Sequence, residues 1–185
     1  MESFFTKKWL TTHIEREHNQ NESDSKVLEK TKIDNVNTNN NNRTLLVGPS
    51  FSGKTYLMLK ILSGIPDRDI YIITKSPPEQ FSNSKIKIKE ISDEIKPLNE
   101  YENCVLVFDD ILGSTNGKHI DDFFMREKHN DLDIYYLSQS YFDLPKISIK
   151  HNSNKIILFN QTLKDIENIH RDVAGYDMSY DEFKG

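Results

Sequence analysis

The sequence has little of several features that define whole classes of protein. Its 185 residues include a single cysteine, Cys104, so a disulfide framework is excluded and a reducing compartment is expected. No segment approaches the roughly 18 uninterrupted apolar residues of a membrane span. Residues 1–20 lack the apolar core and small-residue cleavage site of a signal peptide. We therefore expect a soluble, intracellular protein with no membrane partner.

An excess of positive charge is also absent, because 24 Lys and Arg residues face 29 Asp and Glu residues. The formal net charge is −5, which argues against a protein coated in positive charge for nucleic acid and restricts any DNA contact to a local strip. One candidate is KIKIKEI, Lys85–Ile91, in which lysine alternates with isoleucine. The alternation is typical of a charged edge strand that resists self-association, and it also fits a strip that tracks DNA phosphates.

The chain divides into three regions by composition. About a third of its residues are apolar, which is enough for one buried core. Residues 19–42 are polar and include the tract DNVNTNNNNR, which has nothing to bury and predicts a mobile linker. We expect one folded domain over residues 43–185. Residues 1–18 are expected to be disordered or the remnant of a half zinc finger.

That first region carries part of a zinc-finger pattern. FTKKWLTTHIEREH places His13 and His18 after Phe5 and Leu10, in the spacing of the second half of a Cys₂His₂ finger. The preceding cysteine pair is missing, and such a finger needs four ligands and does not fold without its metal. The segment is either a decayed finger or a coincidence, and we do not expect it to bind zinc.

Five short apolar runs rich in β-branched and aromatic residues predict five strands. The runs are unbroken rather than alternating, which indicates strands buried on both faces of a parallel sheet. Helical patterns lie between them at Lys54–Ser63, His119–Lys128 and Thr162–Val173, the last opening with a Thr162/Asp165 variant of the capping box. This order predicts a three-layer α/β/α fold with a mostly parallel sheet. The predicted strands are Thr44–Gly48, Ile70–Thr74, Asn103–Asp110, Ile134–Gln139 and Lys155–Asn160.

The strongest motif is GPSFSGKT, which fits the P-loop pattern of glycine, any four residues and Gly-Lys-Thr, between a strand and a helix. Its glycines let backbone N–H groups wrap a polyphosphate, and the following helix N-terminus adds partial positive charge. Lys54 is expected to neutralise the β- and γ-phosphates of ATP, and the Thr55 hydroxyl to ligate Mg²⁺. The expected nucleotide-binding residues are Gly48, Pro49, Ser50, Phe51, Ser52, Gly53, Lys54 and Thr55.

A second motif, NCVLVFDD, is typical of a Walker B strand. Asp109 follows four consecutive apolar residues and is expected to hold Mg²⁺ through its water shell. Asp110 is expected to accept a proton from the attacking water or to orient it; the alternative is that it only caps the following turn. With the P-loop, this motif predicts an Mg²⁺-dependent ATPase.

An amide follows the apolar run IYYLSQ. Ligands of open α/β sheets lie outside the carboxyl ends of the strands. If this strand lies between the P-loop strand and the Walker B strand, Gln139 reaches the γ-phosphate. An amide can donate to a phosphate oxygen and accept from a water without adding negative charge beside ATP. We therefore expect Gln139 to sense the γ-phosphate; an ordinary strand-end residue is the alternative.

Together these motifs resemble a known family. GPSFSGKT, VLVFDDIL, FFMREKHNDLDIYYLSQSYFDLPK and IKHNSNKIILFNQ look like the genome-packaging ATPases of poxviruses, other large DNA viruses and Polinton/Maverick elements, in the FtsK-HerA class. The resemblance covers about residues 43–177, and YLSQSYFDLP is far more specific than the P-loop. It implies a P-loop fold with an additional strand, carrying Gln139 as sensor, between the Walker A and Walker B strands.

The resemblance also implies partners. Members of this family form homo-oligomeric rings that hydrolyse ATP to drive double-stranded DNA into a preformed capsid, so capsid or portal components are expected partners. A viral member would act in the host-cell cytoplasm or nucleus, at sites of virus assembly. Relatives usually continue past DVAGYDMSYDEFKG with another apolar segment, so we expect a fragment, a short gene model or a degenerate copy.

Three positions depart from the wider family pattern or need testing against it. Many members of the class have glutamate where this chain has Asp110, although acidic pairs of this kind occur in the viral branch. Arg126 is the candidate arginine finger that acts across a subunit interface, against the alternative of a solvated helix charge. Lys150 stands where arginine is expected in relatives, and lysine does not reproduce a planar bidentate donor.

Two other functions compete with a packaging motor. A small GTPase is disfavoured because NSNKI does not supply the aspartate of the base-reading motif Asn-Lys-x-Asp, and a nucleotide kinase because the chain is poor in the arginines of a kinase lid. The second competitor is a truncated or inactive relative that binds ATP, DNA or a capsid protein without turnover. The missing C-terminal segment favours it, and the intact Walker residues oppose it.

Overall fold

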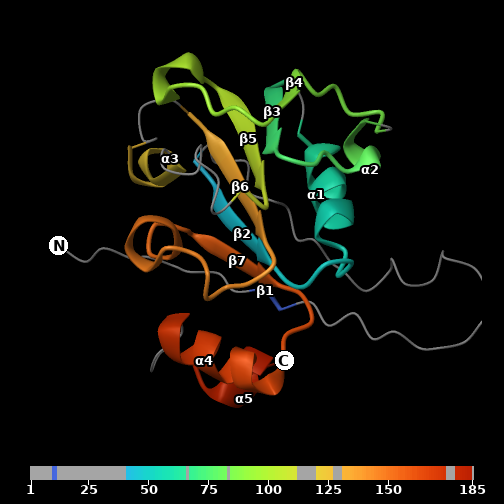
Figure 1. Ribbon diagram of the computed structural model, residues 1–185. Coiled ribbons are helices and arrows are strands. Elements are labelled where there is room, and N and C mark those ends of the chain that lie inside the picture. The colour runs from blue at the N-terminus through green and yellow to red at the C-terminus, as the bar shows by residue number, and fades with distance from the viewer. Residues whose placement is uncertain are drawn as a thin grey trace, which may run out of the picture.

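The computed structural model shows one seven-stranded sheet in the order β1-β7-β2-β6-β5-β3-β4, with every pairing parallel (Figure 1). It describes residues 10–11, 41–65, 67–82, 84–111, 120–126, 131–173 and 178–184. The strands are β1 Leu10–Thr11, β2 Arg43–Val47, β3 Asp69–Thr74, β4 Glu90–Ser92, β5 Cys104–Asp109, β6 Asp133–Ser138 and β7 Lys155–Leu158.

The predicted insertion of an additional strand is confirmed. β6 lies between β2, which leads into the P-loop, and β5, which ends in the acidic pair. On one side Val47 is level with Ser138, and on the other Asp109 is level with Leu137. The carboxyl ends of the three strands therefore meet at one edge of the sheet.

Helices cover both faces of the sheet, which confirms the three-layer architecture (Figure 1). The face with α1 and α2 buries Met58, Leu62 and Phe81 against the sheet. The opposite face buries Phe123 of α3 and Ile169 of α4. The helices are α1 Lys54–Leu62, α2 Glu79–Ser82, α3 Ile120–Arg126, α4 Leu163–Val173 and α5 Tyr180–Lys184, with a 3₁₀ turn at Leu98–Glu100 and a π-helix, η5, at Lys146–Lys150.

The start of α4 confirms the predicted cap. The backbone N–H of Asp165 donates to Thr162 Oγ1 over 3.1 Å, and the Thr162 hydroxyl donates to the Asp165 carboxylate over 2.7 Å. This pair satisfies one of the N–H groups that a helix start leaves without an intrahelical partner. The three long predicted helices are all present, whereas α2, α5 and η5 were not predicted.

The prediction of a strand over Lys85–Ile91 is wrong in its bounds. Only Glu90–Ser92 form a strand, β4, which lies at the edge of the sheet and is parallel to β3. Residues 85–89 still alternate between exposed lysine and half-buried isoleucine, but Ile88 N–H donates locally to the Ile86 carbonyl over 2.9 Å. The alternation thus reports which side chains face the core, not strand pairing.

The other edge of the sheet contains a strand that the sequence did not predict. Leu10 and Thr11 pair with Ile157 and Leu158 of β7. The proposed zinc-finger residues His13 and His18 and the linker over 19–40 lie outside the described residues. No helix in the described part of the chain is long and apolar enough to cross a membrane.

Candidate functional site

The P-loop connects the end of β2 to α1, and two glycines let it take its shape. At Gly48 a Cβ would lie 2.5 Å from Phe159 Cβ and 2.9 Å from the Phe159 carbonyl, so only glycine fits beside the end of β7. Gly53 has φ +98°, a left-handed conformation that L side chains rarely adopt. The α1 helix begins at the next residue, so its N-terminus faces the loop.

Lys54 lies almost completely buried inside this loop, with 9% of its surface exposed. Its ammonium group donates to the carbonyls of Gly48 over 2.6 Å and Pro49 over 2.9 Å. Burial lowers the pKa of Lys54, while the charges of Asp109 and Asp110 act to raise it. The loop therefore holds the positive charge of Lys54 in a poorly solvated position, with the acidic side chains of Asp109 and Asp110 nearby.

The acidic pair stands at the carboxyl end of β5. Burial, and next the charge of Asp110, raise the pKa of Asp109 to about 6, and Lys54 opposes the shift. The Asp109 carboxylate has no hydrogen-bond donor among the described residues. Asp110 is exposed and has a left-handed φ of +51°, which directs the chain away from the strand.

Gln139 joins the P-loop to the acidic pair. Its side-chain amide N–H donates to the Asp110 carboxylate, and its amide oxygen accepts from the Ser50 hydroxyl over 3.3 Å. The sequence predicted the position of this amide but not these two partners. Both its donor and its acceptor face the groups between which a γ-phosphate is expected.

The backbone repeats the same connection. The N–H of Gly48 donates to the Ser138 carbonyl over 3.0 Å, and the N–H of Asp110 donates to the Leu137 carbonyl over 3.1 Å. The end of β6 is therefore hydrogen-bonded to the P-loop on one side and to the acidic pair on the other. Because of these two hydrogen bonds, a movement of the P-loop or of the acidic pair would displace the end of β6 and with it Gln139.

These elements line a cleft of about 950 Å³ at the carboxyl edge of the sheet. Lys54, Thr55, Asp109, Asp110 and Gln139 all contribute to its walls, so the structure brings the predicted site residues together. The segment after β3 also lines it, through Thr74, Lys75, Ser76, Pro78 and Gln80, which sequence reasoning missed. The sequence could have predicted this segment as part of the site, because TKSPPEQ follows a predicted strand at the same edge of a parallel sheet.

The residues present fit a nucleotide and Mg²⁺. Ser52 Oγ is buried without a hydrogen-bond partner among the described residues, as expected for a hydroxyl in a loop shaped for phosphate. Thr55 and Asp109 offer a hydroxyl and a carboxylate, and Mg²⁺ usually takes one or two protein carboxylates with the remaining positions filled by phosphate and water. A cation beside Asp109 would relieve the cost of its buried charge.

Three solved structures share this architecture at low sequence identity. The genome packaging NTPase B204 from Sulfolobus turreted icosahedral virus 2, in complex with sulfate, matches with a TM-score of 0.57 and 17% identity over 79% of this chain and 86% of that one. Its complex with AMPPCP matches with a TM-score of 0.54 and 16% identity, over 78% of this chain and 87% of that one. This chain has the fold of a P-loop NTPase.

The crystal structure of B204 described as the DNA-packaging ATPase from Sulfolobus turreted icosahedral virus also matches this P-loop NTPase fold. Its TM-score is 0.52, with 13% identity over 76% of this chain and 85% of that one. Protein-family models and curated proteins give no match. The likeness therefore lies in the arrangement of strands and helices.

Two further basic positions, the candidate finger Arg126 and Lys150, belong to α3 and η5. Arg126 is the last residue of α3, and its side chain lies outside the described part of the structure. Lys150 is buried in η5, where its ammonium lies 4.3 Å from the centroid of the Tyr141 ring. A side chain held inside its own chain in this way is not placed to reach a neighbouring subunit.

Proposed function

We propose that this chain is an Mg²⁺-dependent ATPase and the motor subunit that drives double-stranded DNA into a capsid. The observation that carries the proposal is the bridge from Ser50 through Gln139 to Asp110, because it joins the phosphate-binding loop to the group that would activate water. The same bridge distinguishes this cleft from a P-loop that only binds phosphate. B204, whose fold the chain shares, is described as a genome packaging NTPase.

Each residue has a distinct part in the proposed hydrolysis. Lys54 would exchange its carbonyl partners for the β- and γ-phosphate oxygens of ATP, with the P-loop N–H groups around them. Thr55 and Asp109 would hold Mg²⁺, which supplies neutralisation of the charge on the phosphates. Catalysis would come from positioning and charge stabilisation rather than from a covalent intermediate.

The proton transfer is assigned to Asp110. A water oxygen forms a bond to the γ-phosphorus while the bond to the β–γ bridging oxygen breaks, giving ADP and phosphate. The Asp110 carboxylate takes up a proton of the attacking water. Gln139 holds that carboxylate through its amide N–H and orients the water, so it couples the presence of the γ-phosphate to the base.

The wider assembly is proposed from the resemblance of the motifs. Residues 43–185 form the ATPase domain, and copies of the chain assemble into a ring around double-stranded DNA. Capsid or portal components are the proposed docking partners. If the source is a virus, the protein acts where particles assemble in the host cell, in its cytoplasm or nucleus.

An ATPase assay of the purified chain tests the proposal. Hydrolysis is measured with and without double-stranded DNA, and with EDTA in place of Mg²⁺, for the wild type and for Lys54→Ala. We expect DNA-stimulated, Mg²⁺-dependent turnover that falls at least about 100-fold in the variant, since the phosphate charge loses its main partner. Turnover that is independent of Lys54, or absent under every condition, contradicts the proposal and leaves a nucleotide- or DNA-binding relative without turnover.

A further inference from the structure

A partly buried ionic cluster connects the residues just after Gln139 to α4. The hydroxyl of Tyr141 donates to Asp172 Oδ2 over 2.8 Å, and Asp172 lies in α4. Lys146 Nζ lies 2.5 Å from Asp172 Oδ1 and Lys150 Nζ lies 3.9 Å from Oδ2. Lys150 also lies over the Tyr141 ring. We call these four residues, Tyr141, Lys146, Lys150 and Asp172, the α4 clamp.

Two members of the α4 clamp are buried, whereas the Lys146 side chain is 58% exposed. Tyr141 is 1% exposed and Lys150 is 9% exposed, so the tyrosine hydroxyl and the lysine ammonium both depend on Asp172 for a charged or polar partner. Burial and the hydrogen bond to Asp172 raise the pKa of Tyr141, which keeps its hydroxyl protonated as a donor. Burial alone would raise the pKa of Asp172, but Lys146 and Tyr141, followed by the charge of Lys150, bring it below its usual range.

The segment between Gln139 and Tyr141 is short and held in place. The buried hydroxyl of Ser138 donates to the Ser140 carbonyl over 2.8 Å and accepts from the Ser140 N–H over 3.3 Å. Ser140 Oγ in turn accepts from the N–H of Phe142 over 3.2 Å. The serines on either side of Gln139 therefore fix the backbone that carries its amide, and a displacement of Tyr141 reaches Gln139 through the single residue Ser140.

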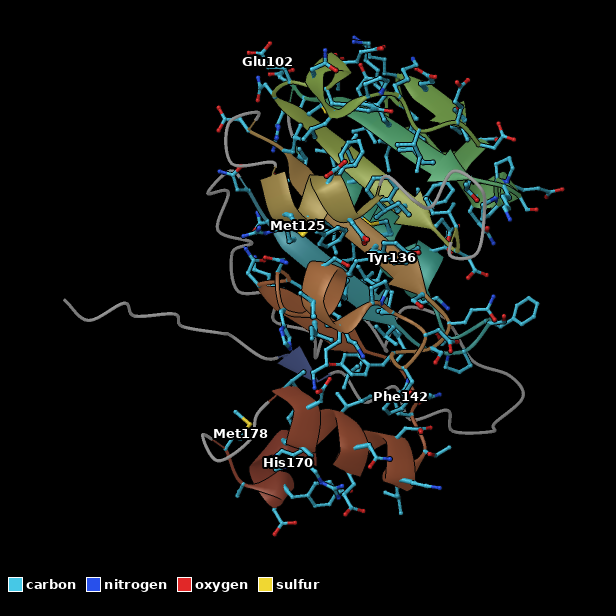
Figure 2. The ribbon with its side chains drawn as sticks, turned by 60° about the vertical axis from the view of Figure 1, so that its left-hand side comes forward. Glu102, Met125, Tyr136, Phe142, His170 and Met178 are labelled. Carbon is cyan, nitrogen blue, oxygen red and sulfur yellow. The ribbon has the colours of Figure 1, made fainter. Side chains whose placement is uncertain are left out.

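The two lysines of the α4 clamp, Lys146 and Lys150, belong to η5. η5 is a π-helix that buries Ser148, Ile149 and Lys150, and π-helical turns in proteins are rare and concentrate at functional sites. Its geometry turns Lys150 inward toward Asp172 and Tyr141. Figure 2 shows Phe142, the neighbour of Tyr141, between the sheet and the helical pair that carries His170.

We propose that the α4 clamp is a positioning device for Gln139, and that it couples the occupancy of the nucleotide cleft to α4. The inference rests on the proposed ATPase function and adds to it a second group of residues outside the cleft. Neither Tyr141 nor Asp172 lines the described cleft, so they act through the loop that carries Gln139. In this structure the hydrogen bond from Tyr141 to Asp172 joins that loop to α4.

The test removes one hydroxyl. Tyr141→Phe keeps the buried ring beneath Lys150 but deletes the donor to Asp172, and Asp172→Asn keeps the shape while removing the charge. We expect kcat to fall about 10-fold in each variant while binding of the analogue AMPPCP changes less than about twofold, because misplaced catalytic groups slow the reaction without loss of affinity. Tyr180→Phe is the matched control, since Tyr180 is in the neighbouring α5 and its hydroxyl has only a 3.5 Å contact with the Leu163 carbonyl.

Amide hydrogen exchange supplies a readout that does not need turnover. In the wild type we expect AMPPCP to change exchange in both α1 and α4, and in Tyr141→Phe the change in α4 should disappear while that in α1 remains. Wild-type kinetics in Tyr141→Phe, a parallel loss of AMPPCP binding, or an unaltered α4 response would each overturn the clamp while leaving the ATPase intact. No Lys54-dependent turnover in the wild type overturns the proposed function first, and the inference with it.

Discussion

The two ends of the parallel sheet surround a carboxylate with different partners, a buried one at the amino end and a half-buried one at the carboxyl end. At the amino end of β6, Asp133 accepts hydrogen bonds from the Asn42 backbone N–H over 2.7 Å and its amide over 3.1 Å, and pairs with Arg68. Arg68 also donates to the Cys104 carbonyl over 2.8 Å. At the carboxyl end, Asp109 has no donor among the residues described, and its pKa is raised to about 6.

The difference is the one expected between a structural group of charges and the proposed functional one. A buried charge is tolerated where partners satisfy it, and it is costly where they do not. At the amino end the partners of Asp133 come from the chain itself, so this group of charges stabilises the amino edge of the sheet. At the carboxyl end Asp109 has no donor among the residues described and Lys54 has backbone carbonyls as its hydrogen-bond partners. This arrangement is consistent with the proposal that Mg²⁺ and ATP bind at the carboxyl end.

The largest expected effect on stability is at the amino end. Asp133→Ala leaves Arg68 buried without its carboxylate, so we expect the protein to lose about 3–5 kcal/mol of unfolding free energy. Urea unfolding followed by circular dichroism measures the loss. Asp69→Ala is the control, because it removes an exposed ion pair with Lys89 and should leave the midpoint nearly unchanged. If the two substitutions lowered the unfolding free energy equally, the buried ion pair of Asp133 would not stabilise the fold more than the exposed ion pair of Asp69.

At the carboxyl end we expect removal of a carboxylate to change the unfolding free energy with the opposite sign. In metal-free buffer at pH 7 we expect Asp109→Asn to stabilise the fold by roughly 1–3 kcal/mol, because the wild-type carboxylate carries a charge that burial and Asp110 disfavour. The folded pKa is about 6 and the ordinary value 3.8, so the folded state binds more protons in that interval. The advantage of the variant should therefore shrink as pH falls from 6 toward 4. A destabilised variant would show that Asp109 is a structural group.

The smallest expected effect is at Cys104, at the amino end of β5. The side chain is 1% exposed, and burial raises the pKa of its thiol to about 12. A thiol reagent at pH 8 should therefore leave the native protein unmodified and label it fully in denaturant, because the thiolate is the reactive form. Mass spectrometry measures the labelled fraction. Rapid labelling of the native protein would mean that the amino end opens readily and is not the closed end of the sheet.

Much of the fold and of the site could be predicted from local patterns. The P-loop needs two glycines and a strand-to-helix turn, so GPSFSGKT identified its position without tertiary information. The central strands were visible because both faces are buried and their apolar runs are unbroken. The placement of β6 between β2 and β5 came from the resemblance, since no local pattern records which strands are neighbours.

What could not be predicted depends on tertiary contacts. The two residues of β1 form a strand only because β7 offers a free edge, and nothing in their own sequence marks them. The π-helix η5 and the partners of Gln139 require side chains from segments far apart in the chain. Alternation at Lys85–Ile91 was misleading because it reports burial on one side, which an irregular segment over the core produces as well as a strand does.

We expect Gln139 to sense the γ-phosphate of the nucleotide and not merely to end a strand. Gln139→Ala, with Gln161→Ala as a matched amide substitution after β7, should be compared for AMPPCP affinity and for single-turnover ATP hydrolysis. We predict that Gln139→Ala keeps its affinity within about threefold and loses at least about 100-fold in rate, since it removes an interaction made at the reacting groups. Equal loss of affinity and rate, or a rate like that of Gln161→Ala, would show that Gln139 is a structural residue at the end of β6 and does not sense the nucleotide.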